Sequence, residues 1–210
     1  MEVFERSFED SLAIFKQLLQ HKKMTRFRNE YLALHTYDQA KLFNHFEAQE
    51  RALVYQYLSP DEIAEIFDDM ENENFDLSKE YFLEMESMYA ATVLAKMYAD
   101  NAVDVLNHIE DRDKIAIFLH LMPKEAASEL SQLMNYIEDS AGSIMTTEFV
   151  MVQENFTVKE AYDYIKTCAV DAETIYYAYV VDEDRILKGV ISLRDLILKE
   201  DSTPIKEIEN

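Results

Sequence analysis

A repeat of twelve residues runs through the first two thirds of this chain and limits how it can fold. The repeated unit has apolar residues at its first, third, fourth and seventh positions, which is the spacing of one face of an α-helix. It begins at Ala40, Ala52 and Ala64 and, after a looser segment at 72–86, at Ala91, Val103, Ile115 and Ala127. A fixed period of this kind predicts a stacked array of short helices, each burying its apolar face against its neighbours.

Helix-start signals recur in phase with this repeat. Ser59 precedes Pro60 and Glu62, a sequence typical of a capped helix N-terminus, and Pro123 with Glu125 gives a similar signal. An ordinary helical bundle whose loops happen to be even in length is the alternative. The recurrence of both signals at one period favours the array.

The last third of the chain has a different composition. Both glycines, Gly142 and Gly189, lie there, which indicates a boundary near residues 136–142 between a helical part and a mixed part. After it we expect a strand at residues 149–153 and then a helix opened by the capping-box pair Thr157 and Glu160.

A hairpin and a helix follow, within residues 174–198. Two segments rich in Ile, Val and Tyr flank a polar turn at Asp182, and Ser192 then stands at a helix N-cap with Asp195 three residues on. The predicted order is therefore β-α-β-β-α. Its last strand runs into a helix N-terminus, which is a place suited to an anion.

The charge of the chain limits its partners. The 210 residues carry a formal net charge of −22, so we exclude nucleic acid as a partner. Because 49% of the residues are hydrophobic, the acidic residues cover a folded core, and bound cations would relieve their mutual repulsion. A single cysteine, Cys168, and the lack of a secretory signal or a long apolar run indicate a cytosolic setting.

Carboxylates gather at helical spacing in two places. In the first, Asp61, Glu65, Asp68 and Asp69 are expected on one side of a helix, and Asp100 and Asp104 repeat the spacing of four residues further on. Like charges at this spacing destabilise a helix, and oxygen ligands suit Mg²⁺ or Ca²⁺. A solvated acidic face is the simpler interpretation for any one of these carboxylates taken alone. Because no nucleophile elbow, P-loop or dinucleotide fingerprint is present, we do not expect an enzyme.

Three segments carry a resemblance to a known family. Residues 189–195, Gly-Val-Ile-Ser-Leu-Arg-Asp, resemble the end of a CBS motif. Residues 136–147, 171–177 and 192–196 are similar, in the same order, to the cytosolic part of the MgtE family of magnesium transporters and channels.

The resemblance implies an α+β multi-domain fold. An acidic, all-α superhelical N domain would occupy residues 1–135, and a connecting segment residues 136–146. The first CBS motif, of order β-α-β-β-α, would span residues 147–203, and residues 204–210 would begin a truncated second motif. A membrane pore domain of the same transporter and a homodimer formed through CBS motifs are the implied partners, at the cytoplasmic face of the cell membrane.

The resemblance also implies a regulatory function. Mg²⁺ would bind carboxylates of the N domain, among them Glu65, Asp100 and Asp104, and close the pore. ATP would be a further ligand.

The implied ATP contacts lie in the CBS motif. Tyr177 would stack on adenine, and Arg194 and Asp195 would meet phosphate and ribose, although Tyr177 could equally be a core strand residue. The alternative function is a soluble CBS-type adenine-nucleotide sensor with a helical effector domain. A third is a helical scaffold related to flagellar motor switch proteins.

Overall fold

The computed structural model describes residues 7–70, 75–137, 140–143, 145–169, 172 and 174–208. Four acids in the segments that carry the family resemblance, Glu138, Asp139, Asp171 and Glu173, lie outside these residues. The chain divides into two compact units, Met1–Ile144 and Met145–Asn210.

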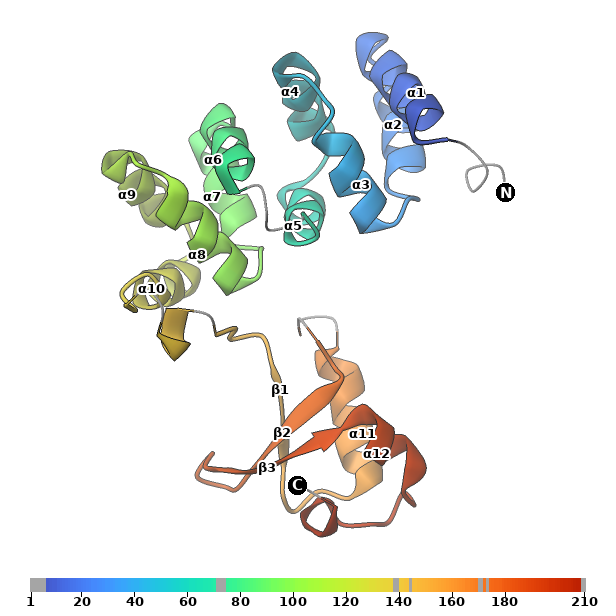
Figure 1. Ribbon diagram of the computed structural model, residues 1–210, viewed down its shortest axis with the longest axis vertical. Coiled ribbons are helices and arrows are strands. Elements are labelled where there is room, and N and C mark those ends of the chain that lie inside the picture. Colours follow the sequence, from blue (N-terminus) through green and yellow to red (C-terminus); the bar gives the residue numbers. More distant parts are fainter. Residues whose placement is uncertain are drawn as a thin grey trace. The chain divides into compact units, whose positions relative to one another are not determined.

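The first unit is built from short helices that follow one another along an arc (Figure 1). They are α1 (Phe8–Gln20), α2 (Met24–Tyr31), α3 (Thr36–Phe43), α4 (Ala48–Tyr57), α5 (Pro60–Asp68), α6 (Phe75–Glu84), α7 (Ser87–Leu94), α8 (Ala99–His108), α9 (Arg112–Leu121) and α10 (Lys124–Leu133). Helices α3, α4 and α5 start twelve residues apart, as do α6, α7 and α8, and the pair α9 and α10. The looser segment of the sequence thus contains one more helix, α6, which begins a second run at the same period.

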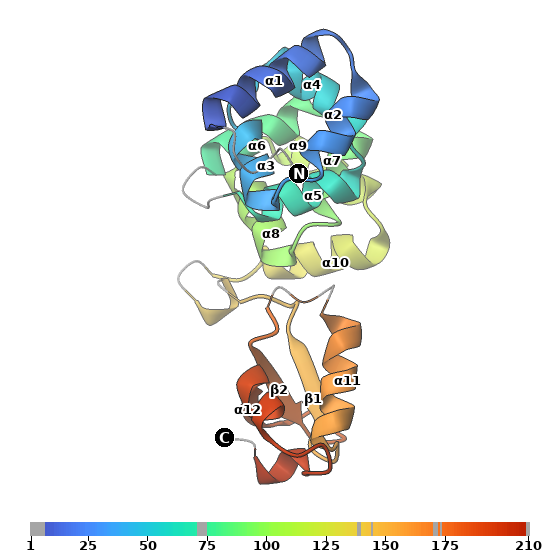
Figure 2. The same cartoon turned by 90° about the vertical axis from the view of Figure 1, so that its right-hand side faces the viewer.

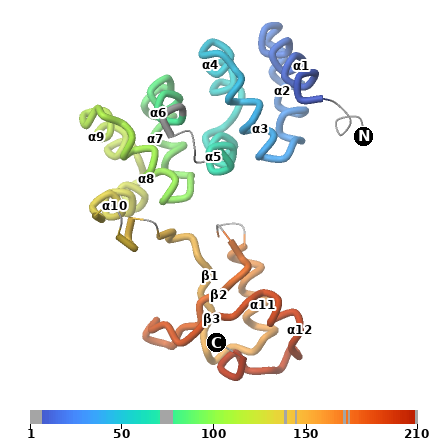
Figure 3. Tube along the Cα trace, viewed as in Figure 1, coloured from blue at the N-terminus to red at the C-terminus, as the bar shows by residue number. Residues whose placement is uncertain are grey.

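These helices pack mainly on the helix two places along the chain. The row α3, α5, α7 and α9 forms one series of contacts, and the row α6, α8 and α10 forms another (Figure 3). Helices of this length are marginal alone, so burial against neighbours stabilises them. The predicted stacked array is confirmed.

Aromatic rings fill much of the core of this unit. The rings of Phe27 and Tyr31 stack with centroids 4.9 Å apart, and Phe43 packs edge-on against Phe67 and Tyr81. The buried hydroxyl of Tyr31 donates to the Gln39 carbonyl oxygen at 2.6 Å, so this ring is buried without losing its hydrogen bond.

An ion pair joins the start of the array to the junction of α4 and α5. The Arg28 guanidinium donates to both carboxylate oxygens of Glu62, at 2.8 and 2.7 Å, and also to the Tyr57 carbonyl oxygen. Glu62 in turn forms a capping box with Ser59 at the start of α5. Burial alone would raise the pKa of the Glu62 carboxyl, but the bonds from Arg28 and Ser59 together lower it.

The second unit contains β1 (Val150–Gln153), α11 (Val158–Cys168), β2 (Tyr177–Val181), β3 (Leu187–Ser192) and α12 (Leu193–Leu198). The sheet order is β1-β2-β3, with β1 parallel and β3 antiparallel to β2. Helices α11 and α12 pack on one face of the sheet (Figure 2). The core between them consists of Val150, Val152, Ala178, Val180 and Ile191 from the strands and Val158, Ala161, Ile165 and Leu196 from the helices. The predicted β-α-β-β-α order is confirmed.

The segment after α12 folds back onto this unit. Ile205, in a short 3-10 turn (Ile205–Glu207), is fully buried in the same core, and its N–H donates to the Phe156 carbonyl oxygen at 2.9 Å. Pro204 pairs with Thr157, the N-cap residue of α11. The described part of the predicted second-motif start therefore packs on the first motif. Residues 209 and 210 lie outside the described residues.

We predict that Arg28→Gln destabilises the first unit by about 1 to 3 kcal/mol at neutral pH, because Glu62 loses its charged donor. Since the folded pKa of Glu62 is lowered, the stabilisation exists above the ordinary carboxyl pKa and disappears as the pH falls through the folded value. Urea unfolding at neutral and acid pH measures this. Arg26→Gln, which breaks an exposed pair on the same helix, is the matched control and should have little effect. Equal effects of both variants would contradict the prediction.

Candidate functional site

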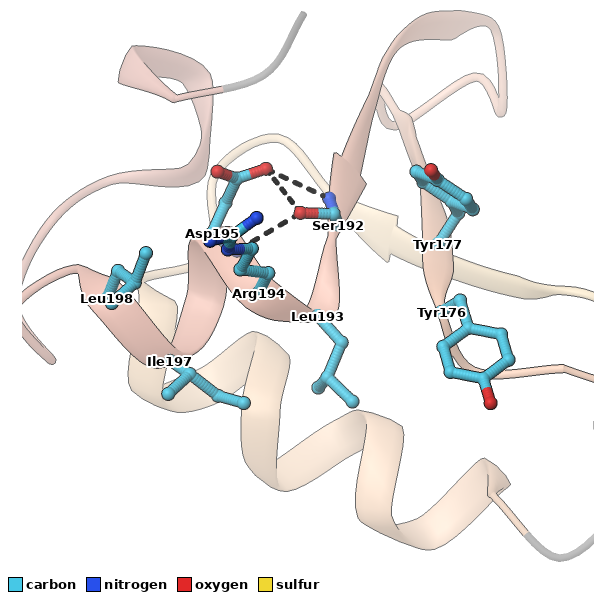
Figure 4. Close-up of a pocket in the computed structure, with 8 residues that line it drawn as sticks. All are labelled: Tyr176, Tyr177, Ser192, Leu193, Arg194, Asp195, Ile197 and Leu198. Atoms are coloured by element: carbon cyan, nitrogen blue, oxygen red, sulfur yellow. Dashed lines mark hydrogen bonds between the residues drawn. The ribbon is translucent and has the colours of Figure 1, made fainter.

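A pocket of about 800 Å³ lies between β2 and α12 in the second unit (Figure 4). It is lined by Tyr176, Tyr177, Ser192, Leu193, Arg194, Asp195, Ile197 and Leu198. All three residues predicted to contact a nucleotide are among them. The structure therefore brings Tyr177, Arg194 and Asp195 to one cavity.

The side chain of Tyr177 lies on the open side of its strand. The residue is 59% exposed, whereas its neighbour Ala178 is 2% exposed and belongs to the core. Strand alternation explains this difference, because successive side chains point to opposite faces. Tyr177 is paired directly with Ser192 across the hairpin, which puts the ring at the start of α12. Of the two placements that the sequence left open, the structure has the pocket-lining one.

Ser192 and Asp195 hold each other in place at the N-terminus of α12. The Ser192 hydroxyl donates to Asp195 Oδ2 at 2.5 Å, and the Asp195 N–H donates back to that hydroxyl at 3.1 Å. The hydrogen bond from Ser192 lowers the pKa of the Asp195 carboxyl, so the group is ionised at neutral pH. Its Oδ1 takes part in none of these bonds and can accept from a ligand hydroxyl.

Some backbone donors at this N-terminus already have acceptors within the protein. The Leu193 N–H donates to the Tyr176 carbonyl oxygen at 2.9 Å, and the Asp195 N–H is used in the cap. The exposed guanidinium of Arg194 is the cation that lines the pocket. An anionic group in the pocket would therefore depend on Arg194 more than the strand-to-helix pattern alone indicates.

The predicted cation ligands lie in the first unit, on two helices. Glu65 is exposed on α5, while Asp100 and Asp104 are half-buried one turn apart on α8. Burial raises the pKa of the Asp104 carboxyl, and the neighbouring His108 opposes that rise only in part. Its ionised form is thus destabilised, and a nearby cation would favour it.

These acids do not form a complete metal centre by themselves. Among the described residues, no group of three His, Cys, Asp or Glu side chains is placed to hold a metal ion. Mg²⁺ keeps several waters and needs only one or two carboxylates from a protein, so two acids on one helix remain compatible with it. Glu65, Asp100 and Asp104 stay a prediction as cation ligands.

Most carboxylates on the acidic side of α5 have partners within the protein, although their spacing suggests a cluster that faces solvent. Three of its four carboxylates bind partners on other elements: Asp61 binds Lys96, Asp68 binds Tyr98 and Asn101, and Asp69 binds Thr36. Within the described part of the chain, no partner contacts the Glu65 carboxylate. Sequence spacing could not reveal these contacts, because every partner is distant along the chain.

No helix in the described ranges has both the length and the apolarity needed to cross a bilayer. The first unit is an acidic superhelix and the second has the strand order, cap and pocket of a CBS motif. Together they define a protein with a helical N-terminal domain followed by a unit of CBS type.

Comparison with known proteins agrees with this class. The profile of the MgtE intracellular N domain matches residues 34–139, and that of the CBS domain matches residues 141–201. The crystal structure of the soluble part of a magnesium transporter is 45% identical, with a TM-score of 0.90, and the alignment covers 97% of this chain and 79% of that one. The chain belongs to the MgtE family of magnesium transporters, as its sequence predicts.

Other relatives give the same family. The magnesium transporter MgtE of Enterococcus faecalis is 44% identical over 98% of this chain and 45% of its own length, and that of Thermus thermophilus is 34% identical over 96% and 45%. The chain thus spans a little under half the length of these relatives. The structure of the cytosolic domain of the Mg²⁺ channel MgtE in complex with ATP is 31% identical, with a TM-score of 0.81, over 95% of this chain and 80% of that one.

We predict that Ser192→Ala returns the pKa of Asp195 toward its ordinary value, because the hydroxyl donor is lost. Carbon-detected NMR titration of the side-chain carboxyls measures this. Thr157→Ala removes the equivalent cap of α11 and is the matched control: it should move the pKa of Glu160 and leave Asp195 unchanged. An Asp195 titration that is unaltered in Ser192→Ala would contradict the assignment of the cause.

Proposed function

We propose that this chain is the Mg²⁺-sensing, regulatory cytosolic region of a magnesium transporter or channel. Family membership supports the transporter, and the net charge of −22 supports the sensing. The single observation that carries the proposal is the half-buried carboxyl of Asp104, whose ionised form is disfavoured by burial, one turn from Asp100. A divalent cation at these two acids would stabilise both as carboxylates.

The regulation follows from differential binding. Uncompensated carboxylates repel one another and favour separated states, whereas a cation that binds only a compact state shifts the population toward it. At high cytosolic Mg²⁺ the compact state would hold the pore closed. At low Mg²⁺ the repulsion would favour opening.

The proposed partners are a membrane pore domain of the same transporter and a second copy of the chain. The relatives are about twice as long as this chain, which leaves room in them for a pore. Ile197 and Leu198 on α12 are 65% and 71% exposed, and such adjacent apolar side chains are typical of a contact surface. We therefore propose a homodimer through the CBS unit, located at the cytoplasmic face of the cell membrane.

ATP is the proposed second ligand. The pocket between β2 and α12 offers an exposed aromatic ring in Tyr177, a guanidinium in Arg194 and an acceptor in Asp195, which suit adenine, phosphate and ribose respectively. These residues fit the ligand from one side only. A second CBS motif or a second copy would supply the other side of the site.

A soluble adenine-nucleotide sensor with a helical effector domain is the second candidate, and this pocket is the observation that favours it. Calorimetry with MgCl₂ and with ATP separates the two functions. Heat of ATP binding without any Mg²⁺-dependent signal would favour the nucleotide sensor. If neither ligand gives a heat of binding, a purely structural role for the module would be favoured.

We predict that millimolar MgCl₂ raises the thermal midpoint of the chain more than KCl of equal ionic strength, because site binding adds to screening. Asp104→Asn should raise the midpoint without Mg²⁺, since it removes a carboxylate disfavoured by burial, and should abolish the extra Mg²⁺ effect. Glu125→Gln, an exposed acid in the first turn of α10, is the matched control and should keep that effect. An equal response of all three proteins to MgCl₂ would contradict the proposed site.

We predict that Tyr177→Ala weakens ATP binding by about tenfold, because stacking on a base contributes on the order of 1 to 3 kcal/mol. Fluorescence titration of the purified chain with ATP measures this. Tyr179→Ala removes a ring from the same strand that does not line the pocket, and it should leave the affinity unchanged. If both variants lose affinity equally, the pocket is not the ATP site.

A further inference from the structure

Helix α8, which carries Asp100 and Asp104, begins without a side-chain cap of its own. Its N-cap residue is Tyr98, whose side chain accepts no bond from the helix. The backbone N–H of Tyr98 donates instead to the Asp68 carboxylate of α5, at 3.1 Å to Oδ1 and 3.2 Å to Oδ2. An acid of another helix therefore satisfies the first donor of α8.

The N-terminus of α8 differs from those helices of this chain whose own residues form a capping box. In α5, α11 and α12 the third helical residue is an acid that accepts the N-cap N–H. In α8 the third residue is Asn101, and its side-chain amide donates to Asp68 Oδ1 at 3.0 Å. Asp68 thus accepts the N-cap N–H that the third helical residue accepts in those helices, and the positive end of the helix dipole favours its charge.

Asn101 contacts both neighbouring acids. Its side-chain amide binds Asp68, and its backbone N–H donates to Asp100 Oδ1 at 2.9 Å. A neutral donor therefore stands between two carboxylates, where a carboxylate would face Asp68 at hydrogen-bonding distance. Two carboxylates at such a distance cannot both stay ionised without a cation between them.

We propose that Asp68 and Asn101 are positioning residues that join α5 to the first turn of α8 without a divalent cation. The amide of Asn101 replaces the cation that an acid at this position would require. The inference rests on the proposed function for the role of Asp100, which lies in this turn, and of Asp104, one turn further along α8. Mg²⁺ then acts on those two acids and not on the contact between the two helices.

The test uses the thermal midpoint of the whole chain in chelator, in MgCl₂ and in KCl of equal ionic strength. Asn101→Asp should lower the midpoint in chelator by roughly 3 to 8 °C and regain most of that loss in MgCl₂, so its Mg²⁺ response exceeds that of the wild type. Asn101→Ala is the matched control for the lost hydrogen bond. It should lower the midpoint without enlarging the Mg²⁺ response.

A swapped pair keeps the test independent of how well each single variant folds. Asp68→Asn combined with Asn101→Asp again places one amide against one carboxylate, and the new amide oxygen can still accept from Tyr98. The double variant should recover the midpoint in chelator and lose the enlarged response to MgCl₂. The effects of the two substitutions would then not add, whereas two independent losses of a contact would add.

The inference is overturned if Asn101→Asp responds to MgCl₂ no more than Asn101→Ala, or if the swapped pair is no more stable than the single variants. Its failure is distinguishable from that of the proposed function. A wild type indifferent to MgCl₂ beside a responsive Asn101→Asp would reject the sensor and keep the positioning pair. If Asp104→Asn loses the Mg²⁺ response of the wild type, and Asn101→Asp shows no enlarged response, the sensor is kept and the positioning pair is rejected.

Discussion

Packing between short helices two places apart along the chain, in the rows α3-α5-α7-α9 and α6-α8-α10, is the constraint on which most of the first unit depends. A helix of eight to ten residues has too few internal hydrogen bonds to persist alone in water, so its stability comes from the neighbours. The period of the repeat fixes which faces meet. The apolar faces of α3, α5, α7 and α9 meet because the helices are equally spaced along the chain. A change in the length of one helix would therefore shift the contacts of the helices that follow it.

Charge acts against this packing and is balanced locally. At α5 and its C-cap three carboxylates have donors elsewhere in the unit, and the part-buried bonds of Asp68 to Tyr98 and Asn101 tie α5 to the start of α8. On α8 the carboxyl of Asp104 is half-buried and its ionised form is disfavoured. The same composition therefore supplies acids that hold the fold and acids suited to an added cation.

Much of the fold could be predicted from the sequence because its signals are local. The helix period, the capping boxes at Thr157 and Ser192 and the hairpin all depend on residues within a few positions of one another. The contacts of Asp68 and the pair of Arg28 with Glu62 could not be predicted, since each joins residues at least thirty positions apart. Only the packed array brings them together.

In the pocket between β2 and α12, too, some features could be predicted from the sequence and others could not. The motif at residues 189–195 indicated Arg194 and Asp195, yet it could not decide the side of Tyr177, because a Tyr-rich strand has rings suited to either face. Pairing with Ser192 decides it. The use of the Leu193 N–H by the Tyr176 carbonyl was equally hidden, because it depends on the register of the hairpin.

The burial of Ile205 gives the second unit a mechanical property. Because this residue is fully buried and Pro204 is paired with the N-cap of α11, the segment after α12 is tied to the start of α11. A displacement of residues 204–208 would therefore act first on the start of α11 and, through that helix, on the sheet.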